Sequence, residues 1–215
     1  MNKDKEIFER IYKKPGAIWT RTESPLELIE LIEGGRIQPC KVIDIGCGEG
    51  VHSVYLAKKG FDVTGIDLSE NAIKHAKQNA KDAGVDVKFI VMDILDLDKL
   101  DKKFDFVLEW AVMHHIRPEQ REKYVENVSG VLKDDGKYLS VCFGRQSVVF
   151  GEAGEKVRDS GKSAPGLKIY FSSQDELKNL FESFFKKIKT RVISRTEGAA
   201  QHVWNYFFME KNERF

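Results

Sequence analysis

The sequence has few cysteines, few prolines and no surplus of charge of either sign. Only 3 cysteines and 5 prolines occur among its 215 residues. The cysteines have no Cys-x-x-Cys spacing, so we expect reduced thiols in a cytoplasmic protein; they are Cys40, Cys47 and Cys142. The 35 basic residues balance 34 acidic residues, which gives a formal net charge of +1. This balance makes nucleic acid or an anionic membrane an unfavoured partner.

Long apolar runs and metal-binding spacings are also lacking. The segment MNKDKEIFERIYKK at the start of the sequence is charged throughout, so no signal peptide is expected, and no apolar run approaches membrane-spanning length. The five histidines lack the spacing with the cysteines that a zinc site needs, so no metal is predicted. With 41% hydrophobic residues, the chain can bury one substantial core without disulfides or metals.

An apolar run that opens into a glycine-rich loop is the most informative part of the sequence. Residues 42–50 read VIDIGCGEG, and β-branched residues flank Asp44 as in a strand that is buried on both faces of a parallel sheet. Three glycines then remove side chains where a small molecule would approach the backbone: Gly46, Gly48 and Gly50. Residues 51–60 continue with helical spacing. The order of strand, glycine loop and helix predicts the first βα unit of a nucleotide-type site.

Acidic residues stand at or near the ends of the next three predicted strands. Residues 61–67 form a second strand that ends in Asp67, about 20 residues after the loop, where such sheets place an acid to bind ribose hydroxyls. Asp67 could instead cap the following helix, but Ser69 is better placed for capping. Two further strands end near Asp93 and Glu109. Because open α/β sheets bind ligands at the carboxyl ends of their strands, we expect a site along this edge.

The loop sequence separates two classes of cofactor. A dinucleotide loop reads G-x-G-x-x-G/A and holds a pyrophosphate on backbone amides, but here Val51 occupies the third glycine position. Glu49 lies inside the loop, and its carboxylate would repel a pyrophosphate. Asp44 and Glu49 suit a cofactor with a cationic amino-acid group instead. S-adenosylmethionine, which carries an ammonium and a sulfonium, is such a cofactor.

Taken together, residues about 40 to 143 resemble a class I S-adenosylmethionine-dependent methyltransferase. The resemblance is carried by an ordered series of motifs: VIDIGCGEG, VTGIDLSENAI, VMDIL, FDFVLEWAVMHHI and VLKDDGKYLSVCF. It implies an α/β, Rossmann-like fold with a doubly wound, mostly parallel seven-stranded sheet and an antiparallel hairpin strand at the C-terminus. It also implies S-adenosyl-L-methionine as the cofactor and S-adenosyl-L-homocysteine as the product.

The resemblance further assigns roles to residues around the predicted site. Gly46, Cys47 and Gly48 would line the methionyl part of the cofactor, with Gly50 in the same loop, and Asp44 would help to hold its amino group. Asp67 would bind the ribose, Leu68 would pack on the adenine, and Asp93 with Ile94 would recognise the adenine edge. Glu109 and Trp110 would lie beside the methionyl end, and His52, which opens the helix after the loop, would also touch the cofactor.

We expect one methyltransferase domain over residues 1–215 with four segments. These are an N-terminal helical cap (1–36), a cofactor-binding core (37–143), an acceptor-side loop (144–169) and a C-terminal helix with strands (170–215). Two interpretations of Trp19 in the cap stay open: it packs the cap onto the sheet, or it closes over the methyl-donor site. The long, irregular loop leaves the fifth strand at the cofactor rim, so we expect it to form the acceptor pocket together with the cap.

The acceptor is less clearly encoded than the cofactor. EWAV follows the fourth strand in place of an Asn-Pro-Pro-Tyr element, which argues against methylation of nucleobase amines. His114 and His115 are candidate general bases, although one of them could pack structurally. A thiolate or a similar soft anion would need only alignment and desolvation, and hence no base.

The order of these segments is similar to the thiol, thiopurine and tellurite methyltransferase group. We therefore favour a small-molecule acceptor whose reacting atom is sulfur, oxygen, nitrogen or a metalloid. A protein or RNA methyltransferase is an alternative, with the basic stretch 186–191 as its docking surface. A non-catalytic protein that binds a nucleotide cofactor is a further alternative, and the oligomeric state is left open.

Overall fold

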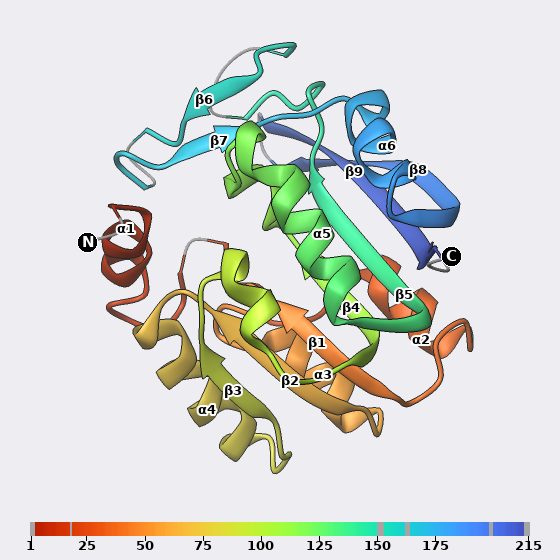
Figure 1. Cartoon of the computed structure of the whole chain (residues 1–215). Coiled ribbons are helices and arrows are strands. Elements are labelled where there is room, and N and C mark those ends of the chain that lie inside the picture. Colours follow the sequence, from red (N-terminus) through yellow and green to blue (C-terminus); the bar gives the residue numbers. More distant parts are fainter. Residues whose placement is uncertain (1–2, 18, 150–152, 162–163, 198–199, 213–215) are drawn as a thin grey trace. The chain divides into compact units, whose positions relative to one another are not determined.

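The computed structural model of the chain shows an α/β protein in which strands and helices alternate (Figure 1). It describes residues 3–17, 19–149, 153–161, 164–197 and 200–212. The larger sheet has 7 strands in the order β3-β2-β1-β4-β5-β9-β8. Their bounds are β1 Lys41–Ile45, β2 Asp62–Asp67, β3 Lys88–Val91, β4 Phe104–Trp110, β5 Leu132–Phe143, β8 Phe185–Glu197 and β9 Ala200–Lys211. The predicted fold, a mostly parallel seven-stranded sheet with an antiparallel C-terminal hairpin, is confirmed.

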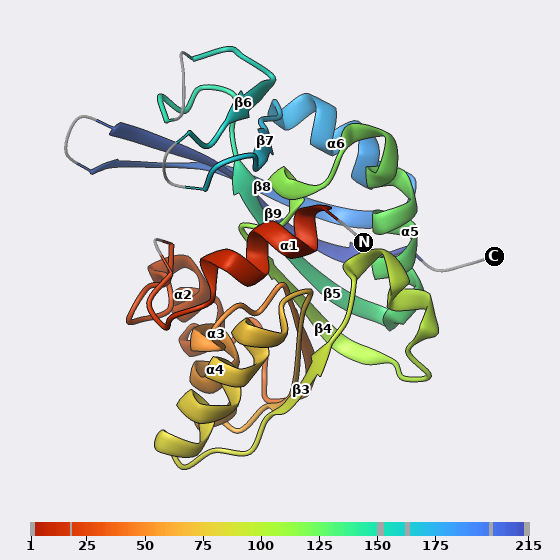
Figure 2. The same cartoon turned by 90° about the vertical axis from the view of Figure 1, so that its left-hand side faces the viewer.

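The chain forms two compact units, and the four predicted segments of a single domain stay a prediction. The first unit comprises residues 1–94 with 104–106, and the second comprises residues 95–103 with 107–215. In the first unit β2 pairs in parallel with β1 on one side and with β3 on the other. Its helices are α1 Lys3–Ile11, α2 Leu26–Glu33, α3 Val51–Lys58 and α4 Glu70–Asp82. Figure 2 shows α1 lying across one end of α4.

Local sequence signals set most element boundaries of the first unit. Ser69 caps α4, because its hydroxyl accepts a hydrogen bond from the backbone N–H of Ala72, as predicted. Pro25 precedes α2, whereas the hydroxyl of Ser24 contacts Nδ1 of His52 and does not cap the helix. Strand β3 ends at Val91, two residues before Asp93, and the backbone N–H of Met92 still donates a hydrogen bond to the carbonyl of Asp67.

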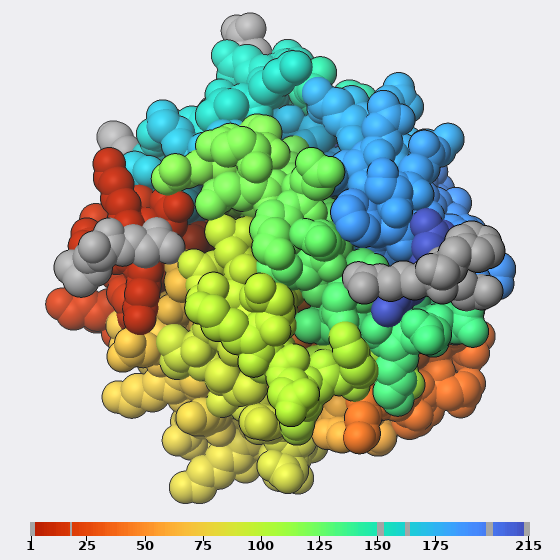
Figure 3. All heavy atoms as spheres, viewed as in Figure 1, coloured from red at the N-terminus to blue at the C-terminus, as the bar shows by residue number. Residues whose placement is uncertain are grey.

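The second unit is built around the antiparallel strands β5, β9 and β8. Phe143 of β5 faces Trp204 of β9, which in turn faces Ile193 of β8. Its helical elements are η1 Ile94–Lys99, which begins in the first unit, η2 Met113–His115, η3 Pro118–Gln120, α5 Arg121–Val131 and α6 Gln174–Glu182. Figure 3 shows the side chains of α5 and α6 beside one another on one face of this unit. Ser173 and Glu176 form a capping box at the start of α6, which explains its sharp beginning.

The expectation of an irregular acceptor-side loop over residues 144–169 is wrong in one respect. Two short antiparallel strands form within and just beyond it, β6 Val157–Asp159 and β7 Lys168–Tyr170. The buried side chain of Arg158 donates hydrogen bonds to the carbonyls of Ser147 (2.8 Å) and Val149 (2.7 Å) and lies over the ring of Phe171. This guanidinium organises the segment, because it joins two backbone carbonyls of the loop to β6. Residues 150–152 and 162–163 of the predicted loop lie outside the described residues.

Candidate functional site

The glycine loop after β1 follows a path that needs glycine. Gly48 and Gly50 have φ values of 53° and 78°, in the left-handed region that side chains disfavour. A Cβ on Gly50 would lie 3.0 Å from atoms of both Ala76 and Phe89. A Cβ on Gly48 would lie 2.8 Å from the hydroxyl oxygen of Tyr12. The loop is therefore packed against helix α4 on one side and covered on the other by Tyr12, which follows α1 directly.

Asp67, at the end of β2, fixes the loop through its carboxylate. One oxygen accepts a hydrogen bond from the backbone N–H of Gly48, and the other accepts one from Ser69, each at 2.9 Å. Burial raises the pKa of Asp67 to about 6, although these hydrogen bonds act in the opposite direction. A carboxylate has about four lone-pair sites, and the backbone N–H of Leu68 also interacts with this one, so room is left for about one hydrogen bond from a ligand hydroxyl.

Asp44 lies deeper than the loop and is 1% exposed. Its carboxylate accepts a hydrogen bond of 2.6 Å from the hydroxyl of Ser53. Burial raises the pKa of Asp44 to about 7 against this hydrogen bond. Burial also keeps the neighbouring thiol of Cys47 protonated by raising its pKa and lowers the pKa of His52 to about 4. Of Asp44, Cys47 and His52, the carboxylate of Asp44 is therefore the group that a cationic ligand would most easily convert to its charged form.

The raised pKa of Asp44 gives a testable pH dependence of stability. Because the folded state binds this proton more tightly than the unfolded state, Asp44 lowers the unfolding free energy progressively as pH rises from 3.8, the ordinary pKa of an aspartate, to about 7. Asp44→Asn removes this effect and can still accept the Ser53 hydrogen bond. Its unfolding free energy minus that of the wild type should rise with pH by roughly 1.4 kcal/mol per pH unit at most. Urea unfolding of both proteins across this range measures the difference, and a constant difference would refute the assignment.

Leu68, Asp93 and Ile94 come to the same edge of the first unit. Leu68 follows Asp67 directly, and the Met92 hydrogen bond to the Asp67 carbonyl brings the residues after β3 beside it. All three side chains are half-buried. The structure thus gathers the residues predicted for ribose and adenine at the carboxyl ends of β2 and β3.

Trp19 contacts other residues of the N-terminal segment. Its indole Nε1 donates a 2.7 Å hydrogen bond to the hydroxyl of Tyr12, and its ring meets the rings of Tyr12 and Phe8 edge-on. Tyr12 was not predicted from the sequence, yet it is buried and covers Gly48. Closure of Trp19 over the methyl-donor site stays a prediction.

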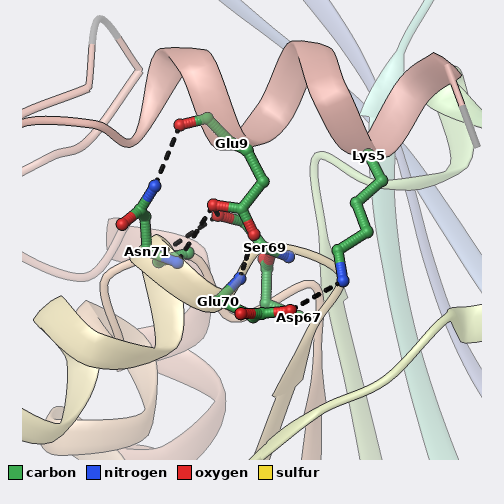
Figure 4. A network of polar contacts seen from close by, with 7 residues as sticks. Lys5, Glu9, Asp67, Ser69, Glu70 and Asn71 are labelled. Carbon is green, nitrogen blue, oxygen red and sulfur yellow. Dashed lines mark hydrogen bonds and ion pairs between the residues drawn. The ribbon is translucent and has the colours of Figure 1, made fainter. Parts of the chain in front are cut away.

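Glu9 of α1 is a second residue that the sequence did not reveal. Its carboxylate accepts hydrogen bonds from Ser69, which caps α4, and from the first residues of that helix (Figure 4). Ser69 links the two carboxylates, because its N–H donates a hydrogen bond to Asp67 and its hydroxyl donates one to Glu9. More than fifty residues separate Glu9 from these partners, so no local pattern signals the contact.

In the second unit, Glu109 is fully buried and fully hydrogen-bonded. Its Oε1 accepts from the backbone N–H groups of Val112 (2.7 Å) and Met113 (3.0 Å). Its Oε2 accepts from the hydroxyls of Ser140 (2.5 Å) and Tyr138 (3.4 Å). Burial raises the pKa of Glu109 against these four hydrogen bonds. The carboxylate therefore holds the turn from β4 into η2.

Trp110 and Ala111 form that turn. Ala111 has a φ of 67°, a left-handed conformation that is uncommon for a residue with a side chain. Trp110 and Ala111 are half-buried. Strained backbone of this kind persists where surrounding contacts hold it, and here the Glu109 hydrogen bonds and a 2.7 Å hydrogen bond from the N–H of Ala111 to Val141 do so.

The two histidines of η2 lie in different surroundings. His114 is buried, and its Nδ1 accepts a hydrogen bond from the N–H of Phe143 at 3.3 Å. Burial lowers the pKa of His114 well below its usual range and that of His115 to about 4. Since Nδ1 of His114 is an acceptor, the neutral ring carries its proton on Nε2. Arg121 supports this element by donating to the carbonyl of Ile116.

Clusters of histidine, cysteine, aspartate and glutamate suited to a metal ion are absent from the part of the chain that the structure describes. Within those same residues, every helix is too short or too polar to cross a membrane.

A glycine loop between a parallel strand and a helix, with an acid at the end of the neighbouring strand, defines an α/β protein with a nucleotide-type cofactor site. Residues 42–136 match the model of the family described as "Methyltransferase domain". This match spans less than half of the chain, and it agrees with the predicted resemblance to the class I S-adenosylmethionine-dependent methyltransferases.

Two relatives show similarity over part of the sequence. It is 30% identical over 139 residues to a 2-heptyl-1-hydroxyquinolin-4(1H)-one methyltransferase of Mycobacteroides abscessus, over 64% of this chain and 60% of the relative. It is 42% identical over 101 residues to a carboxy-S-adenosyl-L-methionine synthase of Nautilia profundicola, over 46% of this chain and 42% of the relative. The chain thus spans 60% or less of the length of these two relatives.

A solved structure extends the similarity of the fold to nearly the whole chain. The 1,6-didemethyltoxoflavin-N1-methyltransferase of Burkholderia thailandensis, with bound S-adenosylhomocysteine, matches with a TM-score of 0.75 at 20% identity. The match covers 97% of this chain and 87% of that chain.

Proposed function

We propose that the protein transfers the methyl group of S-adenosylmethionine to a small-molecule acceptor and releases S-adenosylhomocysteine. The observation that carries this proposal is the contact between the Gly48 N–H and the Asp67 carboxylate. It joins the glycine loop to the acid at the end of β2, and that acid keeps acceptor capacity for a ribose hydroxyl. The relatives named above for methyl transfer are named for small molecules, which supports the acceptor class.

The residues of the first unit fit the cofactor. The loop is free of side chains at Gly46, Gly48 and Gly50, so its backbone can approach a methionyl chain, with Cys47 as a small, uncharged neighbour. Asp67 would accept hydrogen bonds from the ribose, Leu68 would pack on the adenine, and Asp93 with Ile94 would contact its edge. Asp44 would stabilise the cationic amino group from below the loop, because an ammonium favours its charged form. When bound, the cofactor supplies a methyl group activated by its sulfonium.

Glu109 and His52 were predicted to contact the cofactor, but the hydrogen bonds that they form in the structure indicate indirect roles. The carboxylate of Glu109 is committed to Val112, Met113, Ser140 and Tyr138. We propose that it acts by shaping the turn at Trp110. His52 is bonded to Ser24, and we propose that it supports the loop through the start of α3.

Of the two candidate bases, His115 suits proton transfer better than His114. The Nδ1 of His114 is engaged by Phe143, and its Nε2 carries a proton, so the neutral ring has no acceptor to offer. His115 is half-buried, and a base with a pKa of about 4 is effective only toward an acceptor that is acidic or already ionised. We therefore propose acceptors such as thiols or acidic hydroxyls, for which alignment contributes most of the rate.

The segment held by Arg158 is proposed to form the acceptor side. Arg158→Ala leaves the carbonyls of Ser147 and Val149 without their donor, so the segment should loosen. We expect the KM for the acceptor to rise by about threefold to tenfold, while the affinity for S-adenosylhomocysteine stays unchanged. Lys156→Ala, which removes an exposed side chain from the same segment, is the matched control. A loss of S-adenosylhomocysteine affinity equal to the rise in KM would contradict this role.

The test of the proposed function is a methyl-transfer screen that reads S-adenosylhomocysteine release. The acceptors should include thiols, phenols, N-hydroxy compounds, amines, metalloid oxyanions, RNA and a protein mixture. Turnover with a thiol or an acidic hydroxyl compound is the expected result. Turnover confined to RNA or protein would replace the small-molecule acceptor, and binding of S-adenosylmethionine without turnover of any acceptor would favour a non-catalytic role.

A further inference from the structure

Glu9 makes an unusual set of contacts for a residue on a terminal helix. Its carboxylate accepts hydrogen bonds from the hydroxyl of Ser69 (3.1 Å) and from the N–H groups of Glu70 (2.5 Å) and Asn71 (3.2 Å). Its own carbonyl accepts a hydrogen bond from the side chain of Asn71 at 3.1 Å. The first N–H groups of a helix have no partner within the helix, and its dipole favours a negative charge there. Glu9 thus supplies α4 with a cap from another helix (Figure 4).

The same docking of α1 places Tyr12 over the glycine loop. The hydroxyl oxygen of Tyr12 lies 2.8 Å from the position of a Cβ on Gly48, and the Tyr12 carbonyl is 3.0 Å from a ring nitrogen of His75 on α4. Farther along, the N–H of Gly16 donates to the Glu49 carboxylate at 2.8 Å. Since Trp19 donates to the Tyr12 oxygen, the hydroxyl hydrogen of Tyr12 can serve an acceptor above the loop.

On the basis of the proposed function, we propose that Glu9 is a positioning residue of the cofactor site. It docks α1 on the start of α4, so that Tyr12 stays over Gly48 and Ser69 holds the Asp67 carboxylate in place. Glu9 itself does not contact the cofactor. Without it, the closed arrangement of α1 is less populated, and the apparent affinity for the cofactor falls in proportion.

Glu9 also acts on Asp67 through its charge. Burial is the main reason why the pKa of Asp67 is raised, and the negative charge of Glu9 adds to it. The other titratable groups that interact with Asp67 are Asp44, Tyr12 and Cys47. Glu9→Gln removes the negative charge of Glu9 while keeping an oxygen that can accept a hydrogen bond. The pKa of Asp67 should then fall, and cofactor affinity should persist to lower pH.

The experiment is isothermal titration calorimetry with S-adenosylhomocysteine over a pH series. Glu9→Ala should raise the Kd by about tenfold, as expected for the loss of a helix cap that the closed site needs, and Glu9→Gln should raise it less. The control is Lys5→Ala. Lys5 lies on the same helix as Glu9 and forms an exposed ion pair with Glu70 of α4, so its loss should change the Kd by less than about twofold. In Glu9→Gln the pH at which affinity is lost should move down. Thermal unfolding identifies any variant that is not folded.

The possible results separate this inference from the proposed function. If the wild type does not bind S-adenosylhomocysteine, the proposed function fails. If it binds but Glu9→Ala binds equally well or more tightly, α1 is not part of the closed site and the inference is overturned. It is also overturned if Glu9→Gln leaves the pH profile unmoved, because a cap that only stabilises α4 would not change the titration of Asp67.

Discussion

Asp67→Ala should reduce the affinity for S-adenosylhomocysteine by about 100-fold or more. The ribose would lose a charged hydrogen-bond acceptor, and such a hydrogen bond contributes roughly 1.5–3 kcal/mol. The loop would also lose the contact that fixes the N–H of Gly48. Calorimetric titration with S-adenosylhomocysteine measures the effect directly.

The control for this variant lies on the same strand. Asp62 begins β2 and is exposed, so Asp62→Ala removes a carboxylate of equal size far along the strand from the loop. It should leave the affinity within about twofold, because surface substitutions have small effects. An Asp67→Ala protein that is folded and binds as tightly as Asp62→Ala would show that the ribose assignment is wrong.

Glu109→Ala should lower the free energy of unfolding by about 3–5 kcal/mol. The substitution leaves the buried N–H groups of Val112 and Met113 without acceptors, at about 1–3 kcal/mol each, and opens a cavity beside Ser140. This is a large share of the 5–15 kcal/mol that is typical of a folded protein. Urea unfolding at neutral pH is the measurement.

Two matched variants separate this network from a general effect of losing a glutamate. Glu109→Gln keeps an acceptor for the two N–H groups, and the hydroxyls of Ser140 and Tyr138 can rotate to accept from the new amide, so we expect a loss of about 1 kcal/mol. Glu122 is exposed on α5, and Glu122→Ala should stay within about 0.5 kcal/mol of the wild type. Equal stability of Glu109→Ala and Glu122→Ala would contradict the role given to the buried carboxylate.

The first βα units were predictable because their signals are local. Buried strands read as β-branched runs, Ser69 is a strong helix cap, and the spacing from the glycine loop to Asp67 follows from the length of one helix and one strand. The antiparallel hairpin at the C-terminus was predicted from the resemblance to the methyltransferases, and the pairing of β8 with β9 confirms it. The class of cofactor followed from Glu49 and Val51 in the loop.

The contacts that complete the site were not predictable from local patterns. Glu9 reaches α4 across 60 or more residues, and Glu109 meets Ser140 across 31. Both carboxylates look like ordinary acids in the sequence, because only the folded chain shows which backbone N–H groups lack a partner near them. The strands β6 and β7 were missed because each has only 3 residues, and the buried central residue of β6 is an arginine, Arg158.

The most direct test of the central claim is a calorimetric comparison of S-adenosylhomocysteine with NAD on the wild-type protein. The claim is that the loop at Gly48 and the carboxylate of Asp67 form a site for an adenosyl cofactor with an amino-acid group and not for a dinucleotide. We predict saturable, one-to-one binding of S-adenosylhomocysteine and no measurable binding of NAD. Binding of NAD without binding of S-adenosylhomocysteine would contradict the claim.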